Sequence, residues 1–178
     1  FYVHNAFRSP GELEKEDFGK RKAEVYGSRY EGFRHGINFH SKYIQAESKE
    51  DLEGVTFAFV CVDKGSSRSD IFNLLISMEI PFIDVGMSLN KNIGTIDGLI
   101  RMTYYSTESA KEMLAKKLAP IHDGVDDIYR NNIQISEINA LNACLAVIRF
   151  KQLRAFYSDD NNFLHILLSI HDLNMVGI

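Results

Sequence analysis

One stretch decides the fold: Val55-Thr56-Phe57-Ala58-Phe59-Val60-Cys61-Val62-Asp63-Lys64-Gly65-Ser66-Ser67-Arg68. Eight residues without a charge run directly into an aspartate, a glycine and two serines. Such a run is typical of a strand buried on both faces, as in a parallel sheet with helices on either side. It places Asp63 at the end of the strand and predicts that Ser66 or Ser67 caps a helix over 70–78. Ligands bind outside the carboxyl ends of strands in open α/β sheets, so Asp63 is placed to meet a substrate or a metal.

The composition is that of an ordinary globular protein. The 178 residues, 45% hydrophobic and 25% charged, predict a single domain over 1–178 with a proper core. A formal net charge of −4 gives no general affinity for nucleic acid, and no apolar run approaches the length of a membrane span. The absence of a secretory signal, with two cysteines in apolar segments, favours a cytoplasmic protein. The first residue is Phe1 rather than a methionine, so we expect the chain to be cut from a longer protein.

Strands and helices alternate along the chain. Helices are predicted over 20–33, 49–53, 70–78, 109–118 and 136–156, and strands over 37–43, 55–62, 81–85, 93–96, 99–105 and 163–170. The strand over 81–85 is expected to end at Gly86, and Asp97-Gly98 is expected to form a hairpin turn. The order predicts an α/β fold, with a Rossmann-like, mostly parallel sheet flanked by helices and antiparallel strands in the second half. No Gly-x-Gly-x-x-Gly loop occurs, so the first βα unit is expected to be missing.

The two cysteines are expected to be inert. Cys61 belongs to the predicted buried strand. Cys144 lies in the helix over 136–156 and is expected on its apolar stripe, which includes Ile138, Leu141, Leu145 and Ile148. A thiol packed in a core stays protonated, so neither sulfur is predicted to act as a nucleophile. No Cys-x-x-Cys pair and no histidine pair at i, i+4 occurs, so no zinc is expected.

Four polar segments have to be weighed between a functional and a structural interpretation. In the loop His4-Asn5-Ala6-Phe7-Arg8, the guanidinium suits phosphate and the amide suits orienting hydrogen bonds, although the loop also fits a polar surface. Lys20-Arg21-Lys22 starts a helix, where the helix dipole disfavours cations unless an anion lies nearby. Asp63 and Arg68 together suit a cation or phosphate site, or else a helix cap and a solvated arginine. Asp123, Asp126 and Asp127 match no cation-binding loop and are expected to be solvated.

In their order, these segments resemble the second half of the ThiF/MoeB/HesA family, adenylating enzymes related to ubiquitin-activating enzymes. The loop from His4 to Arg8 is similar to the family's S-N-L-x-R, and Gly19-Lys20-Arg21-Lys22 is similar to its G-x-x-K. The segment from Asp63 to Arg68 is similar to D-N-x-x-x-R, which ends a buried strand in the family. The segment from Pro81 to Gly86 is similar to the next strand, which carries a proline and a glycine. Order and spacing hold from residue 1 to about 101.

The resemblance implies a reaction. ATP binds in the crevice, and the C-terminal carboxylate of a ubiquitin-like or sulfur-carrier protein attacks the α-phosphate and releases pyrophosphate. The resemblance assigns Asn5, Arg8 and Lys22 to the triphosphate, where they offset charge that shifts to the leaving group. It assigns Asp63 to Mg²⁺ and Arg68 to steadying the loop around Asp63. The family is usually dimeric, so a homodimer is expected. Without the glycine-rich loop, this chain alone is expected to be inactive.

The chain also departs from the family's pattern. Lys64 stands where the family commonly has asparagine, and Arg8 is followed by Ser9-Pro10-Gly11 where the family often continues with glutamine. No cysteine lies between Met102 and Ser136, where members that form a thioester often keep theirs. The chain therefore resembles an adenylating branch without a thioester step, or a relative with a different outcome. Two alternatives remain: a non-catalytic partner subunit that keeps the fold for protein binding, and a nicotinamide-dependent oxidoreductase domain.

Overall fold

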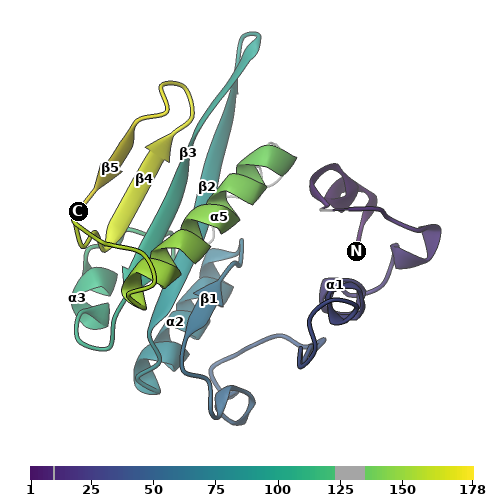
Figure 1. The fold of residues 1–178 in the computed structure, drawn as a ribbon, viewed down its shortest axis with the longest axis horizontal. Helices are drawn as coiled ribbons and strands as arrows, with labels where there is room; N and C mark the ends of the chain where they lie inside the picture. The colour runs from purple at the N-terminus through teal and green to yellow at the C-terminus, as the bar shows by residue number, and fades with distance from the viewer. Residues whose placement is uncertain (10, 123–134) are drawn as a thin grey trace. The chain divides into compact units, whose positions relative to one another are not determined.

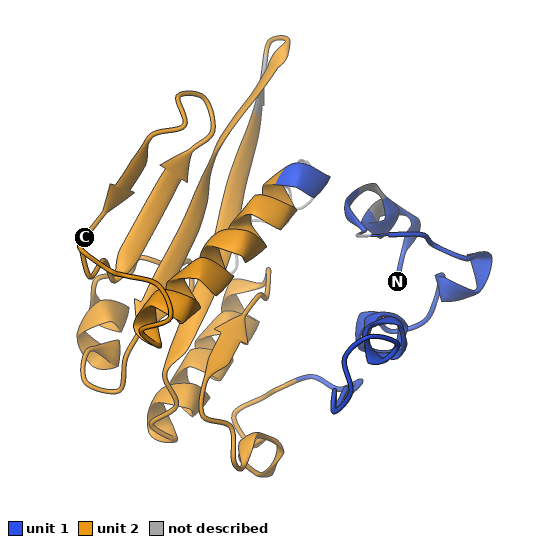
Figure 2. Cartoon of the chain, in the orientation of Figure 1, with its two compact units in different colours: residues 1–43, 134–137 blue, residues 44–133, 138–178 orange. Residues whose placement is uncertain are grey.

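The computed structural model describes residues 1–9, 11–122 and 135–178, and the chain divides into two compact units (Figure 2). The first unit comprises residues 1–43 and 134–137, and the second comprises 44–133 and 138–178. The second unit confirms the expected fold class, because it is a mixed α/β structure with one five-stranded sheet and helices on both faces. The single domain over 1–178 stays a prediction.

The first unit is small and is built on one helix. Its elements are α1 (Lys22–Glu31) and two 3-10 turns, η1 (Val3–Arg8) and η2 (Lys15–Asp17). Phe1 is buried and packs edge-on against Phe18 and Tyr26, with ring centroids 6.0 and 5.8 Å apart. Asp17 is buried as well and forms an ion pair with Arg29 of α1. An aromatic cluster and a shielded ion pair thus hold the turns against α1.

The strand predicted over 37–43 is wrong. This segment is described, and it forms neither a strand nor a helix. The ring of Phe39 lies instead against the backbone of α1 at Gly27. An alternating pattern of apolar and polar residues shows only that the apolar side chains pack against something. Here Phe39 packs against a helix rather than within a sheet.

The second unit contains the sheet (Figure 1). Its strands, in spatial order, are β1 (Ala58–Val60), β2 (Phe82–Asn92), β3 (Thr95–Tyr105), β4 (His165–Ser169) and β5 (Met175–Gly177). β1 runs parallel to β2, with Val60 opposite Asp84, and the other three pairs are antiparallel. The strand predicted over 55–62 is therefore shorter than expected. It is also not buried on both faces, because Val60 is buried whereas Phe59 is 44% exposed.

Helices cover the two faces of this sheet. The elements are η3 (Glu50–Leu52), α2 (Gly65–Ser77), α3 (Ala110–Ala115) and α5 (Ser136–Leu153), of which the part from residue 138 belongs to this unit. Successive strand residues point to opposite faces, so Phe82 and Ile83 enter different cores. Phe82 packs with Phe72 of α2 and Tyr105 of β3, with ring centroids 4.6–4.9 Å apart. Ile83 packs below α5 at Ala146.

The hairpin is longer than predicted and turns at another place. β2 continues through Gly86 to Asn92, and the two-residue turn is Ile93-Gly94. Gly94 has φ +81°, the left-handed conformation that such turns require and that glycine adopts without strain. The predicted turn at Asp97-Gly98 is wrong, because these residues lie inside β3 opposite Leu89 and Asn90.

Candidate functional site

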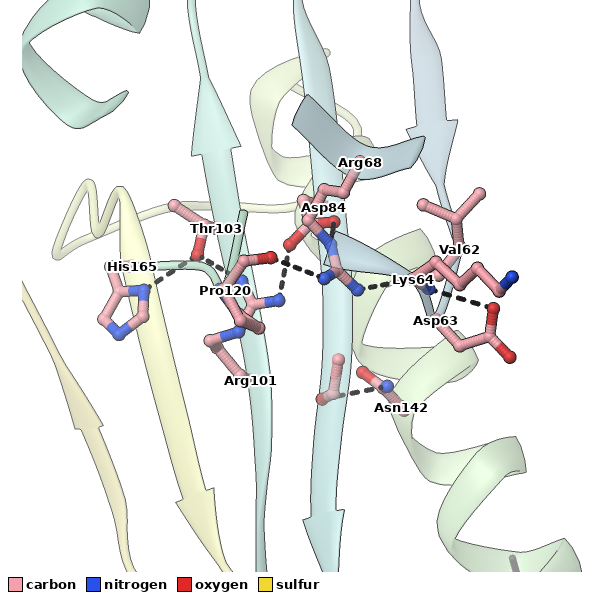
Figure 3. Close-up of polar contacts among 11 residues, drawn as sticks. Val62, Asp63, Lys64, Arg68, Asp84, Arg101, Thr103, Pro120, Asn142 and His165 are labelled. Carbon is pink, nitrogen blue, oxygen red and sulfur yellow. Dashed lines mark hydrogen bonds and ion pairs between the residues drawn. The ribbon is translucent and has the colours of Figure 1, made fainter. Parts of the chain in front are cut away.

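The loop between β1 and α2 carries Asp63 (Figure 3). Asp63 is exposed, and its Oδ1 accepts the backbone N–H of Lys64 at 3.0 Å. α2 begins at Gly65 with Lys64 as its N-cap residue, so Ser66 and Ser67 lie inside the helix. The predicted serine cap is therefore wrong, and the carboxylate beside the helix start is that of Asp63. A negative charge at this end of a helix is favoured by the helix dipole.

Gly65 allows a second segment to cross the start of α2. A Cβ on Gly65 would collide with the backbone of His122, so a larger residue would push the two segments apart. The segment over 119–122 therefore passes directly against the first turn of α2. This crossing brings the carbonyl of Pro120 within reach of side chains on α2.

Arg68 of α2 joins three segments at this point (Figure 3). Its Nε donates to Oδ1 of Asp84 at 3.0 Å, and its Nη1 donates to the carbonyl of Pro120 at 2.8 Å. Its Nη2 donates to the carbonyl of Val62, the residue that precedes Asp63. Arg68 is 3% exposed and so belongs to the core rather than to solvent. The role in steadying the Asp63 loop that the resemblance implied stays a prediction, and the contact with Val62 is where Arg68 meets that loop.

Asp84 is the central acidic residue of the site, and sequence reasoning missed it. It lies on β2, has no exposed surface, and contacts Nη2 of Arg101 at 2.5 Å in addition to Arg68. The pKa of Asp84 is raised, because the effect of burial is larger than that of the guanidinium groups of Arg101 and Arg68, which lower it. The available signal was a charged residue inside the otherwise apolar run from Pro81 to Val85.

The polar contacts continue from Arg101 across the sheet. Nη1 of Arg101 donates to Oγ1 of Thr103 at 3.0 Å, and this oxygen lies 2.8 Å from Nδ1 of His165 on β4. The hydroxyl oxygen of Thr103 accepts the N–H of Arg101, so its own proton is available to donate to Nδ1 of His165. A neutral imidazole that accepts at Nδ1 carries its proton on Nε2. Burial, and then the charge of Arg101, lower the pKa of His165 and so favour this neutral form.

We expect His165 to make stability depend on pH. Its pKa is lower in the folded chain than the ordinary value of 6.5, so the unfolded chain takes up the proton first. The free energy of unfolding should therefore fall as pH drops through this ordinary value toward the lower folded pKa. His165→Gln cannot titrate and should flatten the decline, measured as the denaturation midpoint at several pH values. His40→Gln, at an exposed position, is the control and should decline as the original protein does. An equally steep decline in His165→Gln would contradict the expectation.

α5 presents an unexpected face to the sheet. The predicted apolar stripe includes Leu141 and Ile148, which are exposed, whereas Asn142 and Arg149 are buried on either side of Ala146. Nδ2 of Asn142 donates to the carbonyl of Gly86 at 3.3 Å (Figure 3). The predicted stripe is therefore not the packed face. The small Ala146 allows α5 to approach the sheet, and among the described residues Oδ1 of Asn142 and Nε of Arg149 have no hydrogen-bond partner.

The expected burial of both cysteines is wrong, since Cys61 and Cys144 are exposed. Cys61 follows the short β1, and Cys144 lies outside the packed face of α5. Although Cys61 reaches the surface, desolvation raises the pKa of its thiol, and the negative charge of Asp84 raises it further. Burial is the larger cause of the raised pKa of Cys61 and disfavours the thiolate, so the expectation that Cys61 is not a nucleophile stays a prediction.

The other predicted site residues lie in the first unit. Asn5 is buried, and its Oδ1 accepts the backbone N–H of Tyr2 at 2.9 Å, so it caps η1. Nε of Arg8 is shielded from water and has no hydrogen-bond partner among the described residues. Lys22 is the exposed first residue of α1. Asp63 and Arg68 thus belong to one unit and the three proposed triphosphate ligands to the other.

The acidic groups of the site suit a magnesium ion that shares its coordination with water and substrate better than one that is enclosed by protein ligands alone. In the described ranges, no group of three or more His, Cys, Asp or Glu side chains could hold a metal ion. Mg²⁺ commonly uses one or two carboxylates and takes its remaining ligands from water and substrate phosphates. Asp63 fits that pattern, because it is exposed and one of its oxygens is oriented by Lys64 N–H. The predicted solvated residues Asp123, Asp126 and Asp127 lie outside the described residues.

Comparison with known proteins supports the fold. No family model matches the chain, and no curated protein sequence matches it. A crystal structure of PaaA matches with a TM-score of 0.56 and 13% identity, over 93% of this chain and 57% of that one. MccB of E. coli in a crystal structure with ATP matches with a TM-score of 0.57 and 14% identity, over 93% of this chain and 49% of that one. MccB in a crystal structure with MccA-N7isoASN matches with a TM-score of 0.62 and 14% identity, over 100% of this chain and 54% of that one.

These likenesses, at such low identity, show the fold alone. The chain spans about half the length of the solved structures that it matches. Among the described residues, none of the helices is both long and apolar enough to cross a membrane.

Proposed function

We propose that the protein carries out ATP-dependent adenylation of the C-terminal carboxylate of a ubiquitin-like or sulfur-carrier protein. The observation that carries the proposal is Asp63, an exposed carboxylate at the carboxyl end of β1, behind which Arg68 is buried. This is the position at which α/β sheets bind ligands. The family motifs seen in the sequence, and the fold shared with MccB, which has been crystallised with ATP, support the same function.

In this proposal each residue has a defined role. Asp63 would bind Mg²⁺ and, through it, a phosphate oxygen of ATP. Arg8 would contact the triphosphate through a guanidinium whose Nε has no hydrogen-bond partner among the described residues. Lys22 would add a positive charge from the first turn of α1. Asn5 would contribute its amide Nδ2, because its Oδ1 is already occupied by Tyr2. When bound, Mg²⁺ neutralises charge on the phosphates as pyrophosphate leaves.

The test is ATP–pyrophosphate exchange with the full-length protein. Exchange of labelled pyrophosphate into ATP should require both Mg²⁺ and a purified carrier, taken from a panel of ubiquitin-like and sulfur-carrier proteins. A carrier-free reaction is the control. Exchange that rises above this control with one carrier supports adenylation, and its absence with the whole panel would refute the proposal.

A second candidate function is a non-catalytic partner subunit. It is favoured by Lys64, whose ammonium-bearing side chain directly follows the proposed metal ligand and replaces the asparagine of the family. A cation at this position competes electrostatically with Mg²⁺. Absence of exchange, together with formation of a stable complex with an active adenylating subunit, would favour this candidate.

We expect residues 1–178 alone to bind ATP poorly. Phosphates depend on backbone N–H groups at a glycine-rich loop and helix start, and this sequence contains no Gly-x-Gly-x-x-Gly. Isothermal titration of the isolated chain with Mg-ATP should show no saturable binding in the micromolar range. The full-length protein serves as the positive control. Tight binding by the isolated chain would mean that the nucleotide site has been assigned to the wrong place.

A further inference from the structure

The buried contacts behind Asp63 form a continuous support for its loop. The guanidinium of Arg68 holds the carbonyls of Val62 and Pro120, which come from two segments on either side of the start of α2. Val62 directly precedes Asp63, so this contact constrains the backbone that presents the carboxylate. The planar guanidinium has several N–H donors in a fixed arrangement and can hold two carbonyls at once, which the ammonium of a lysine cannot do in the same geometry.

Arg68 is itself held in place by Asp84. The ion pair joins Nε of Arg68 to Oδ1 of Asp84 at 3.0 Å, and both side chains are almost completely removed from water. In the described part of the chain, Asp84 is the carboxylate that pairs with Arg68. Its other oxygen contacts Arg101, whose guanidinium is fixed in turn by Thr103. Asp84 is therefore anchored from the sheet and orients Arg68 from one side.

We propose that Asp84 is a positioning residue for the adenylation site: through Arg68 it fixes the Val62 carbonyl and thereby the orientation of Asp63. The inference rests on the proposed function, in which Asp63 binds Mg²⁺. Groups that orient a metal ligand from behind typically change metal affinity or activity 10–100-fold when they are removed. A role in stability alone would leave the Mg²⁺ dependence unchanged.

The chain offers a matched control pair. Arg149 of α5 is 3% exposed and contacts Asp159 at 2.5 Å, so it is a second buried arginine with one carboxylate partner. Among the described residues, its hydrogen bonds go to Asp159 and Gln152 and not to the loop over 61–66. Asp159→Asn should therefore destabilise the fold in the same chemical way as Asp84→Asn, without acting on Asp63.

The experiment compares Asp84→Asn with Asp159→Asn in the full-length protein. Asp84→Asn should raise the Mg²⁺ concentration for half-maximal exchange about tenfold or more, and Asp159→Asn should not. In an Asp63→Asn background, adding Asp84→Asn should cause less than about a twofold further loss, because the two changes act on one interaction. An unchanged Mg²⁺ dependence, or full additivity of the two losses, would overturn the proposal.

Hydrogen exchange of the backbone amides over 61–66 gives a readout that does not require activity. These amides should exchange faster in Asp84→Asn than in Asp159→Asn. If Asp84→Asn does not fold, Arg68→Lys is used, since it keeps the positive charge and loses the planar guanidinium. Equal protection of the loop in these variants would overturn the positioning role. Loss of protection in a protein that shows no exchange activity would instead refute the proposed function while the positioning role stands.

Discussion

Replacing Asp63 with asparagine in the full-length protein should lower carrier-dependent ATP–pyrophosphate exchange by about 10²-fold or more. The change removes a negative charge and keeps the size and shape of the side chain. Stabilisation of charge that develops in a transition state typically contributes a few kcal/mol, which corresponds to this loss of rate. The melting temperature should change little, because Asp63 is exposed and an asparagine oxygen can still accept the N–H of Lys64.

Asp70→Asn is the matched control for this experiment. Asp70 is the sixth residue of α2 and is also exposed, so its replacement removes the same charge near the same helix start. Exchange by this variant should equal that of the unmodified protein. If both Asp63→Asn and Asp70→Asn keep full exchange activity, then Asp63 is not a metal ligand and the non-catalytic candidate gains support.

Sequence patterns predicted an element correctly where the segment itself determines its secondary structure. The strand predicted over 163–170 contains β4, and the helix over 136–156 contains α5 with its end shifted by three residues. The hairpin could not be located this way, because both Ile93-Gly94 and Asp97-Gly98 are plausible turns. The choice between them depends on register, and register depends on which face of each strand meets α2, α3 or α5.

The buried contacts behind Asp63 could not be predicted from the sequence, for a different reason. Arg68 was visible in the sequence, but its partner Asp84 lies on another element, and Thr103 and His165 come from two further strands. The register of the sheet brings Asp84, Thr103 and His165 directly opposite one another across β2, β3 and β4. Such a polar row crosses three strands and leaves no spacing pattern along the chain. Only the charge inside an apolar strand marks it.

The face of α5 illustrates the same limit. A hydrophobic stripe predicts the packed side of a helix when only apolar contacts decide its rotation. Here Asn142 finds the carbonyl of Gly86, and Arg149 finds Asp159, so both polar side chains can be buried. These bonds offset part of the cost of burying the two side chains, although Oδ1 of Asn142 and Nε of Arg149 have no partner among the described residues, and the helix packs with Ala146 against the sheet.

Replacing Asp84 with alanine should have the largest effect on stability in this chain. Arg68 and Arg101 would keep their charges in a site that is almost closed to water, with no carboxylate to pair with. Breaking a buried ion pair in this way typically costs about 3–5 kcal/mol. The free energy of unfolding, measured by chemical denaturation, should fall by that amount. Asp70→Ala, at an exposed position, should change it by less than about 0.5 kcal/mol.

A second replacement shows whether unpaired charge is the cause. Arg101→Met removes one of the two guanidinium groups and keeps most of the side chain's length. In the double variant Asp84→Ala with Arg101→Met, one unpaired charge is gone, so the loss of stability should be smaller than the sum of the single losses. Additive losses would mean that Asp84 stabilises the sheet by packing rather than by pairing with Arg101. The double variant should still show the altered Mg²⁺ dependence, because Arg68 remains without the carboxylate that orients it toward Val62.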